Sequence, residues 1–467
     1  MEQSKQMTRA ILTAESVLLA GFGQANQAVA RALRRAAPEI SGIQILAFDD
    51  NPTATSVAEE LDVELVKSPD VVQLRRLLAA SDVVLPTPGM SDFHQLFELL
   101  DPEKVLSEYD IFAALDNRPF VAVTGTNGKT TVTELTAEML CRSGIKAVAA
   151  GNTYRALTDA AADLEVEIFV VEASSFQLRH TKQFQPLAAA WLNFAPDHLD
   201  VHRSLQSYED AKSLVWGCSQ HSTERRATLP IANADDQVVS KRAPDRAKYF
   251  SCAKEADFCV SDRWLIAEGE KFAEVAELPR NRPHDLANAL AATALTLATK
   301  GNLSAVAEVL NNFSGLAHRL QLVAEGGGVK WYNDSKATTP HATAAAVSGF
   351  KSVVLIAGGR NKGLDLTPIA AATPTSSETR SSADSIEAVV AIGETASEIG
   401  LLFAGRCPVT VAESMAEAVR AAAELAKPGD AVLLSPGCSS HDWYLDYQER
   451  GNDFTQKAQV AAKRVAQ

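Results

Sequence analysis

Paired cysteines, aromatic residues and uninterrupted apolar runs are all scarce in this sequence. The six cysteines form no CxxC pair and no metal-ligand spacing; they are Cys141, Cys218, Cys252, Cys259, Cys407 and Cys438. This excludes a disulfide-stapled small domain and favours a reducing, cytoplasmic compartment. No stretch approaches the roughly 18 apolar residues of a membrane-spanning helix. The sequence therefore predicts a soluble cytoplasmic protein that binds no membrane.

Positive charge is also in deficit. The chain has 44 Lys and Arg against 58 Asp and Glu, a formal net charge of −14, which argues against nucleic acid as a partner. Aromatic residues are 6% of the 467 residues, but hydrophobic residues reach 46%, as in ordinary globular proteins. At roughly 100 to 200 residues per domain, this length predicts two to four domains.

Short apolar runs alternate with helical patterns along almost the whole chain. This alternation is typical of strand-helix units stacked on parallel sheets, so the predicted class is α/β. The pattern restarts near residues 115 and 317, which predicts three domains: residues 1–115, a central 116–317 and 318–467. The segment 373–385 is rich in Ser, Thr and Ala, and we expect a surface loop there.

The most specific motif is a glycine-rich turn between an apolar strand and a helix. It reads Gly125-Thr-Asn-Gly128-Lys129-Thr130-Thr131 after the run Val121 to Val123. Backbone N–H groups freed by the glycines make a cradle for phosphates, and the helix N-terminus favours anions. Lys129 would contact the β- and γ-phosphates and Thr130 would hold Mg²⁺. The sequence therefore predicts a nucleoside triphosphate site.

Three further residues are candidates for this site. Glu172 ends the apolar run from Ile168, His198 lies shortly after a run ending at Phe194, and Lys212 lies on an expected helix. Taken singly, each has an ordinary alternative as a cap, a surface histidine or a solvated lysine. Their order behind a phosphate loop favours a site for Mg²⁺ and phosphate at the sheet edge.

At this point the chain resembles the ATP-dependent Mur ligases of bacterial peptidoglycan synthesis. The resemblance spans nearly the whole sequence and is carried by the phosphate loop, Gly151-Asn152, the segments 172–177, 197–200 and 233–236, and His318-Arg319. Segments 174–178, 333–338 and 434–440 look like the branch that adds D-glutamate. Within the motifs, His284-Asp285, Thr87 and His441 depart from the usual residues.

The resemblance implies three domains, with a central P-loop ATPase domain between Rossmann-like N- and C-terminal domains. The first would hold a UDP-sugar, and the last would close over ATP and bring D-glutamate. The implied cofactors are ATP and Mg²⁺, with Lys212 carbamylated by CO₂. The implied substrates are UDP-N-acetylmuramoyl-L-alanine and D-glutamate, and a monomer is expected.

The resemblance also implies residue roles, which we group by ligand. The catalytic residues would be Lys129, Glu172, His198 and Lys212. Those at the metal would be Thr130, Glu172, His198 and Lys212. The ATP site would comprise Gly125, Thr126, Asn127, Gly128, Lys129, Thr130, Thr131, Asn288, Arg319, Asp334 and Lys336. The UDP-sugar would contact Gln24, Ala25, Asp49, Thr87, Gly89, Asn152 and His198. D-glutamate would contact Thr338, Lys362, Ser440 and Tyr447.

Other functions stay open at this stage. Gly21-Phe-Gly23-Gln-Ala-Asn26 resembles a dinucleotide fingerprint with Asn26 at the third glycine, and Asp49 follows at a suitable distance. An NAD enzyme would leave the phosphate loop unexplained. A different Mur or folylpolyglutamate-type amide ligase and a non-catalytic nucleotide-binding regulator remain as alternatives.

Overall fold

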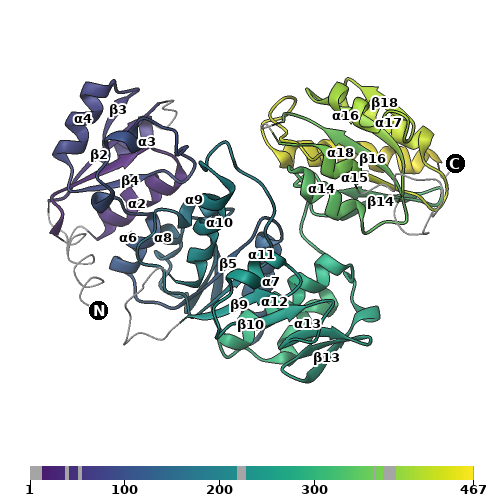
Figure 1. The fold of residues 1–467 in the computed structure, drawn as a ribbon, viewed down its shortest axis with the longest axis horizontal. Coiled ribbons are helices and arrows are strands. Elements are labelled where there is room, and N and C mark those ends of the chain that lie inside the picture. Colours follow the sequence, from purple (N-terminus) through teal and green to yellow (C-terminus); the bar gives the residue numbers. More distant parts are fainter. Residues whose placement is uncertain are drawn as a thin grey trace. The chain divides into compact units, whose positions relative to one another are not determined.

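The computed structural model describes residues 13–36, 42–50, 55–217, 228–361, 364–371 and 385–465. Lys362, Cys218 and nearly all of the segment 373–385 lie outside these ranges. The chain divides into two compact units, Met1–Asn281 with Asp285–Phe313, and Arg282–His284 with Ser314–Gln467. The described residues form three sheets, two in the first unit and one in the second (Figure 1).

The N-terminal sheet is parallel, with strand order β3-β2-β1-β4. Its strands are β1 (Ser16–Ala20), β2 (Gln44–Asp49), β3 (Glu64–Lys67) and β4 (Val83–Pro86). The helices around it are α2 (Gln24–Arg35), α3 (Thr55–Glu60), α4 (Val71–Ala80), α5 (Leu96–Leu99), α6 (Glu108–Leu115) and the 3-10 turn η1 (Pro102–Lys104). All five residues of β1 are buried, so the apolar run near the N-terminus is a core strand, as expected.

The second sheet has the strand order β13-β12-β11-β10-β9-β8-β5-β7-β6. Its strands are β5 (Phe120–Thr124), β6 (Ala147–Gly151), β7 (Ile168–Glu172), β8 (Ala188–Trp191), β9 (Leu229–Asn233), β10 (Lys248–Ser251), β11 (Phe258–Ser261), β12 (Trp264–Ala267) and β13 (Glu270–Glu274). The helices are α7 (Lys129–Arg142), α8 (Leu157–Ala160), α9 (Ser175–Leu178), α10 (Leu205–Ser213), η2 (Leu214–Trp216), α11 (Gln237–Arg242), η3 (Val275–Glu277), α12 (Pro283–Ala298) and α13 (Leu303–Asn312).

Helices cover both faces of the central strands of this second sheet. Val121 and Val123 of β5 pack in one cluster with residues of α7, α12 and α13. Phe120 and Ala122 pack in the opposite cluster with residues of α6, α8 and α11. Successive side chains of a strand point to opposite faces, so the run from Phe120 is apolar throughout because both faces are buried. This packing fixes the carboxyl end of β5, where the glycine-rich turn begins.

The third sheet has the strand order β14-β15-β19-β16-β17-β18. Its strands are β14 (Gln321–Gly326), β15 (Val329–Asn333), β16 (Ser352–Gly358), β17 (Ser385–Ile392), β18 (Val409–Ala412) and β19 (Ala431–Leu434). The helices are α14 (Pro340–Val347), α15 (Thr367–Ala371), α16 (Ala396–Phe403), α17 (Met415–Leu425) and α18 (Tyr447–Val465). The pairs are parallel except the β14–β15 hairpin.

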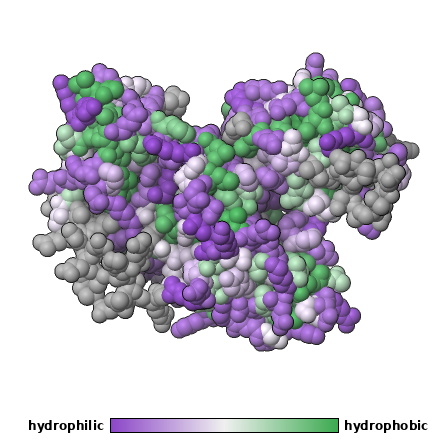
Figure 2. All heavy atoms as spheres, in the orientation of Figure 1, coloured by the Kyte–Doolittle hydropathy of each residue, from purple (hydrophilic) through white to green (hydrophobic). Residues whose placement is uncertain are grey.

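The expected α/β class with three sheet-centred domains is confirmed, whereas the exact boundaries near 115 and 317 stay predictions. No helix in the described ranges is long and apolar enough to cross a membrane. On the face drawn in Figure 2, hydrophilic residues separate small apolar groups. The most exposed large apolar side chains are dispersed in sequence, at Leu164, Leu401 and Leu445.

Candidate active site

The glycine-rich turn joins the end of β5 to the start of α7. Gly125 has a φ of +158° and Gly128 a φ of +84°, a backbone region that side chains disfavour. A Cβ on Gly128 would also lie 2.5 Å from Asn288 Oδ1. The turn therefore requires glycine at this position and places Asn288 of α12 against the loop. The start of α7 then offers the backbone amides that favour a phosphate.

A residue that the motif did not reveal fastens this loop. Asn193, two residues after β8, accepts a hydrogen bond from Asn127 N (2.8 Å) and donates one to Asn127 O (3.1 Å) through its side-chain amide. Its carbonyl accepts a third bond from Thr126 N at 3.1 Å. The expected strand to Phe194 therefore ends earlier, at Trp191. In the sequence, the role of Asn193 is indicated only by its position directly after an apolar run.

Two lysines share one oxygen of the loop. Lys129 Nζ donates to Gly125 O at 2.9 Å and to Thr126 O at 3.1 Å, and Lys212 Nζ donates to Gly125 O at 2.8 Å. Lys212 is 2% exposed. Burial, and secondly the charge of Lys129, hold the pKa of Lys212 well below its usual range, against an opposing effect of Asp197. Burial and the neighbouring Lys129 therefore disfavour the charged form of Lys212.

Glu172 ends β7 and is 1% exposed. Its Oε1 accepts hydrogen bonds from Asn152 Nδ2 (2.9 Å) and Thr153 Oγ1 (2.7 Å). Its Oε2 is buried without a hydrogen-bond partner among the described residues. Burial raises the pKa of Glu172, but the charge of Lys129 and the bonds from Asn152, Thr153 and Thr130 outweigh it and lower the pKa. Glu172 is therefore a carboxylate at neutral pH.

His198 lies in the loop after β8 with a φ of +57°. Its Nε2 is 3.3 Å from Asp197 Oδ2, and its ring meets Phe176 edge-on, with centroids 4.6 Å apart. Tyr208 links His198 to the lysine, because its ring centroid is 5.9 Å from that of His198 and 4.6 Å from Lys212 Nζ. The three predicted catalytic residues behind the phosphate loop thus lie around it.

A second glycine turn joins β1 to α2 in the N-terminal sheet. Gly21 has a φ of +82°, and a Cβ there would lie 2.5 Å from Thr87 Cγ2. Asn26, which stands at the third glycine position, is buried and donates to Gly21 O at 2.7 Å and Leu85 O at 3.0 Å. Asp49 Oδ2 accepts from Phe22 N at 2.7 Å. The turn therefore brings together Thr87, Asp49 and the start of α2, where Gln24 and Ala25 lie.

The C-terminal candidates gather at one end of the third sheet. Asp334 follows β15 and accepts from Leu320 N (3.1 Å) and Ser435 Oγ (2.8 Å). Lys336 Nζ lies 4.1 Å from the ring centroid of Tyr447. Gly437 N donates to Ala337 O at 2.9 Å, which holds the segment of Thr338 beside that of Ser440. Lys362 lies outside the described residues.

Arg450 is the buried residue that sequence reasoning missed in this domain. It is 1% exposed, and its guanidinium donates to Ser335 Oγ (2.9 Å), Ser335 O (2.8 Å) and Cys438 O (3.2 Å). Burial lowers its pKa to about 10, so it stays charged at neutral pH. Arg450 therefore ties together the two loops that carry the C-terminal candidates.

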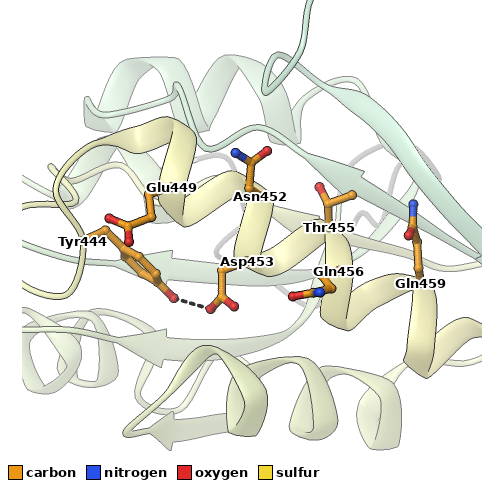
Figure 3. Close-up of a pocket in the computed structure, with 7 residues that line it drawn as sticks. All are labelled: Tyr444, Glu449, Asn452, Asp453, Thr455, Gln456 and Gln459. Atoms are coloured by element: carbon orange, nitrogen blue, oxygen red, sulfur yellow. Dashed lines mark hydrogen bonds between the residues drawn. The ribbon is translucent and has the colours of Figure 1, made fainter.

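Two surface cavities within the described residues lie apart from these candidates. The hollow in Figure 3 has a volume of about 650 Å³ and is lined by Tyr444, Glu449, Asn452, Asp453, Thr455, Gln456 and Gln459. A second, of about 330 Å³, is lined by Phe97, Leu100, Pro102, Val105, Arg179, His180, Thr181 and Lys182. Neither contains a predicted site residue.

Comparison with known proteins connects this geometry to a family. Residues 123–296 match the Mur ligase middle domain, and residues 318–438 match the Mur ligase glutamate ligase domain. A protein of Methylococcus capsulatus named UDP-N-acetylmuramoylalanine–D-glutamate ligase is 38% identical, over 81% of this chain and 81% of its own length. The chain belongs to the Mur ligase family.

Other relatives of this Mur ligase cover more of its length. Proteins with the same name from Hahella chejuensis and Legionella pneumophila strain Lens are both 34% identical, over 89% and 94% of this chain and 92% and 97% of theirs. Among solved structures, the UDP-N-acetylmuramate-alanine ligase of Thermotoga maritima has a TM-score of 0.56 at 17% identity, over 96% of this chain and 99% of its own. A pseudomurein peptide ligase type C from Methanothermus fervidus has a TM-score of 0.54 at 15% identity, over 97% of this chain and 100% of its own. These two likenesses concern the fold.

Proposed function

We propose that this Mur ligase uses ATP to join D-glutamate to UDP-N-acetylmuramoyl-L-alanine in the cytoplasmic synthesis of peptidoglycan precursors. The curated relatives that match most of the chain carry the name of this activity. The observation that carries the proposal is the gathering of Lys129, Glu172 and Lys212 at the phosphate loop. We propose that the enzyme acts as a monomer.

Forming an amide from a carboxylate requires a leaving group, which ATP supplies. The γ-phosphoryl group passes to the L-alanine carboxylate of the UDP-sugar, and the bond to ADP breaks, which gives an acyl phosphate. Lys129 would exchange its bonds to Gly125 O and Thr126 O for the phosphates and stabilise the charge that develops during transfer. The amine of D-glutamate then attacks the acyl carbon, and phosphate and a proton leave.

The residues around Glu172 fit Mg²⁺. In the described ranges, no three His, Cys, Asp or Glu side chains cluster as a metal site of their own. Mg²⁺ in nucleotide sites, however, uses one or two carboxylates together with substrate phosphates and water. The buried Oε2 of Glu172 would be such a ligand, and Thr130, His198 and the carbamylated Lys212 would be the other protein groups at the metal. When bound, Mg²⁺ would offset phosphate charge.

Carbamylation of Lys212 belongs to the same proposal. An uncharged amine is the form that reacts with CO₂, and the lowered pKa of the buried Lys212 beside Lys129 favours that form. A carbamate would turn this amine into an anion beside the cation Lys129 and Mg²⁺, where a second ammonium group would be repelled.

The remaining assignments belong to the same proposal. The turns at Gly21 and Thr87, with Asn152 and His198, would hold the UDP-sugar. Asn288, Arg319, Asp334 and Lys336 would contact ATP, and Thr338, Lys362, Ser440 and Tyr447 would contact D-glutamate. The domain boundaries near 115 and 317 belong to this proposal as well.

A coupled assay tests the activity directly. Purified enzyme with ATP and Mg²⁺ should release phosphate only when UDP-N-acetylmuramoyl-L-alanine and D-glutamate are both present. L-glutamate serves as the matched control, and Lys129→Ala should lower the rate by about 10²- to 10³-fold, since one charge-stabilising donor is lost. Phosphate release with another amino acid in place of D-glutamate would contradict the proposed substrate.

A further inference from the structure

The turn after β6 is built against the last residue of β7. Gly151 pairs with Glu172 in the parallel ladder and has a φ of +100°. A Cβ on Gly151 would lie 2.4 Å from Glu172 O, so glycine is required for this approach. The next residue, Asn152, donates its backbone N–H to the same oxygen at 2.9 Å. Backbone contacts alone therefore hold this turn against Glu172.

The side chains of this turn divide the two oxygens of the carboxylate. Asn152 Nδ2 and Thr153 Oγ1 both donate to Oε1, at 2.9 Å and 2.7 Å. In the described part of the chain, Oε2 has no hydrogen-bond partner although it is buried. Two donors on Oε1 fix the rotation of the carboxylate, and Thr130 of the phosphate loop is a further hydroxyl that interacts with Glu172. Oε2, which has no hydrogen-bond partner among the described residues, is left for a ligand.

Thr153 differs from Asn152 in what else it is expected to do. Asn152 is assigned to the UDP-sugar, and its flexible amide could leave Glu172 when that substrate binds. No contact with a substrate is proposed for Thr153, and its branched side chain is stiff about the Cα–Cβ bond. Its hydroxyl is therefore the donor that can hold Oε1 throughout the reaction.

We propose that Thr153 is a positioning residue, whose hydroxyl holds Oε1 of Glu172 so that Oε2 faces Mg²⁺. The inference rests on the proposed function, since it takes Glu172 as the residue that binds the metal. Groups that orient a metal ligand commonly contribute about 10- to 100-fold to metal affinity or activity. Thr153 contacts neither the substrate nor the metal in this proposal and acts only through Glu172.

The test measures metal binding apart from turnover. Mn²⁺ is titrated into the full-length enzyme with ADP present, and free Mn²⁺ is followed by electron paramagnetic resonance. Thr153→Val keeps the shape and loses the hydroxyl, and it should weaken Mn²⁺ binding about tenfold. Thr153→Ser restores a hydroxyl and should bind Mn²⁺ like the wild type. If Thr153→Val folds poorly, Thr153→Ala should show the same weakening.

The outcomes separate this inference from the proposed function. Activity of Thr153→Val should require more Mg²⁺ but approach the wild-type kcat when Mg²⁺ saturates, whereas general damage to the fold would lower kcat as well. If Glu172→Gln loses Mn²⁺ but Thr153→Val binds it normally, the role of Thr153 is overturned and the Mg²⁺ assignment stands. If Glu172→Gln binds Mn²⁺ normally, both are overturned.

Discussion

Two buried basic side chains, Lys212 in the central domain and Arg450 in the C-terminal domain, differ in their hydrogen bonds and in the direction of their chemistry. Arg450 donates to three acceptors, and its pKa of about 10 keeps it charged. Lys212 donates to a single carbonyl beside Lys129, and its pKa falls well below the usual range. Each nitrogen of Arg450 donates to an acceptor and joins two loops of the fold, whereas the amine of Lys212 donates to one carbonyl and is the group proposed to react with CO₂.

The largest expected effect of this difference concerns turnover at Lys212. Lys212→Met should lower phosphate release by about 10²- to 10³-fold, since the anion proposed for this position is lost. Its free energy of unfolding should fall by no more than about 1 kcal/mol, because one hydrogen bond is removed. Phosphate release is measured with and without short-chain carboxylic acids added to Lys212→Ala, which should recover part of the rate. Normal turnover of Lys212→Met would refute the carbamate.

The next effect concerns stability at Arg450. Arg450→Met leaves the carbonyls of Ser335 and Cys438 buried without their donor, and it should lower the free energy of unfolding by about 3 kcal/mol. Urea unfolding measures this value. Arg450→Lys keeps the charge but has fewer donors, so its free energy of unfolding should lie between those of the wild type and Arg450→Met. If Arg450→Met lost as little free energy of unfolding as Lys212→Met, the two buried side chains would contribute equally to stability, against this prediction.

A third buried basic side chain, His202, extends the comparison to the dependence of stability on pH. His202 is 1% exposed, with Nε2 2.9 Å from Ser175 Oγ. Burial, and then the charges of Arg179, His198 and Lys212, lower its pKa from 6.5 to about 4. The unfolded chain therefore takes up a proton first, so the stability from this residue is complete above pH 6.5 and is lost as the pH falls toward about 4.

The matched variant for this prediction is His202→Gln, which cannot gain the charge. Between pH 7 and about pH 4.5, the wild type should lose about 1 to 2 kcal/mol more stability than this variant, after allowance for solvent screening. Urea unfolding at both pH values gives the difference. Parallel losses in the two proteins would show that His202 titrates normally.

The smallest effect is expected for an exposed cation. Lys146 pairs with Glu165, and their side chains are 62% and 80% exposed. Because such a pair is solvated in the folded and unfolded states, Lys146→Met should change the free energy of unfolding by at most about 0.5 kcal/mol. A change as large as that of Arg450→Met would show that burial does not set the ranking.

The features that depend on the local spacing of residues could be predicted from the sequence. The strands and the turn at Gly125 follow from apolar runs and glycines, and Glu172 lies where its run predicted. Asn193 and Arg450 could not be found in this way, because their partners Asn127 and Ser335 lie 66 and 115 residues away in the chain. The contact of the Thr153 hydroxyl with Glu172 likewise depends on the pairing of β6 with β7, which the sequence does not reveal.

The most direct test of the central claim is a crystal structure of this enzyme with Mg²⁺ and a non-hydrolysable ATP analogue. The account predicts the triphosphate against the turn from Gly125 to Thr131, with Lys129 Nζ moved from the Gly125 carbonyl to the phosphates. A triphosphate bound at any other place, with this turn empty, would contradict it.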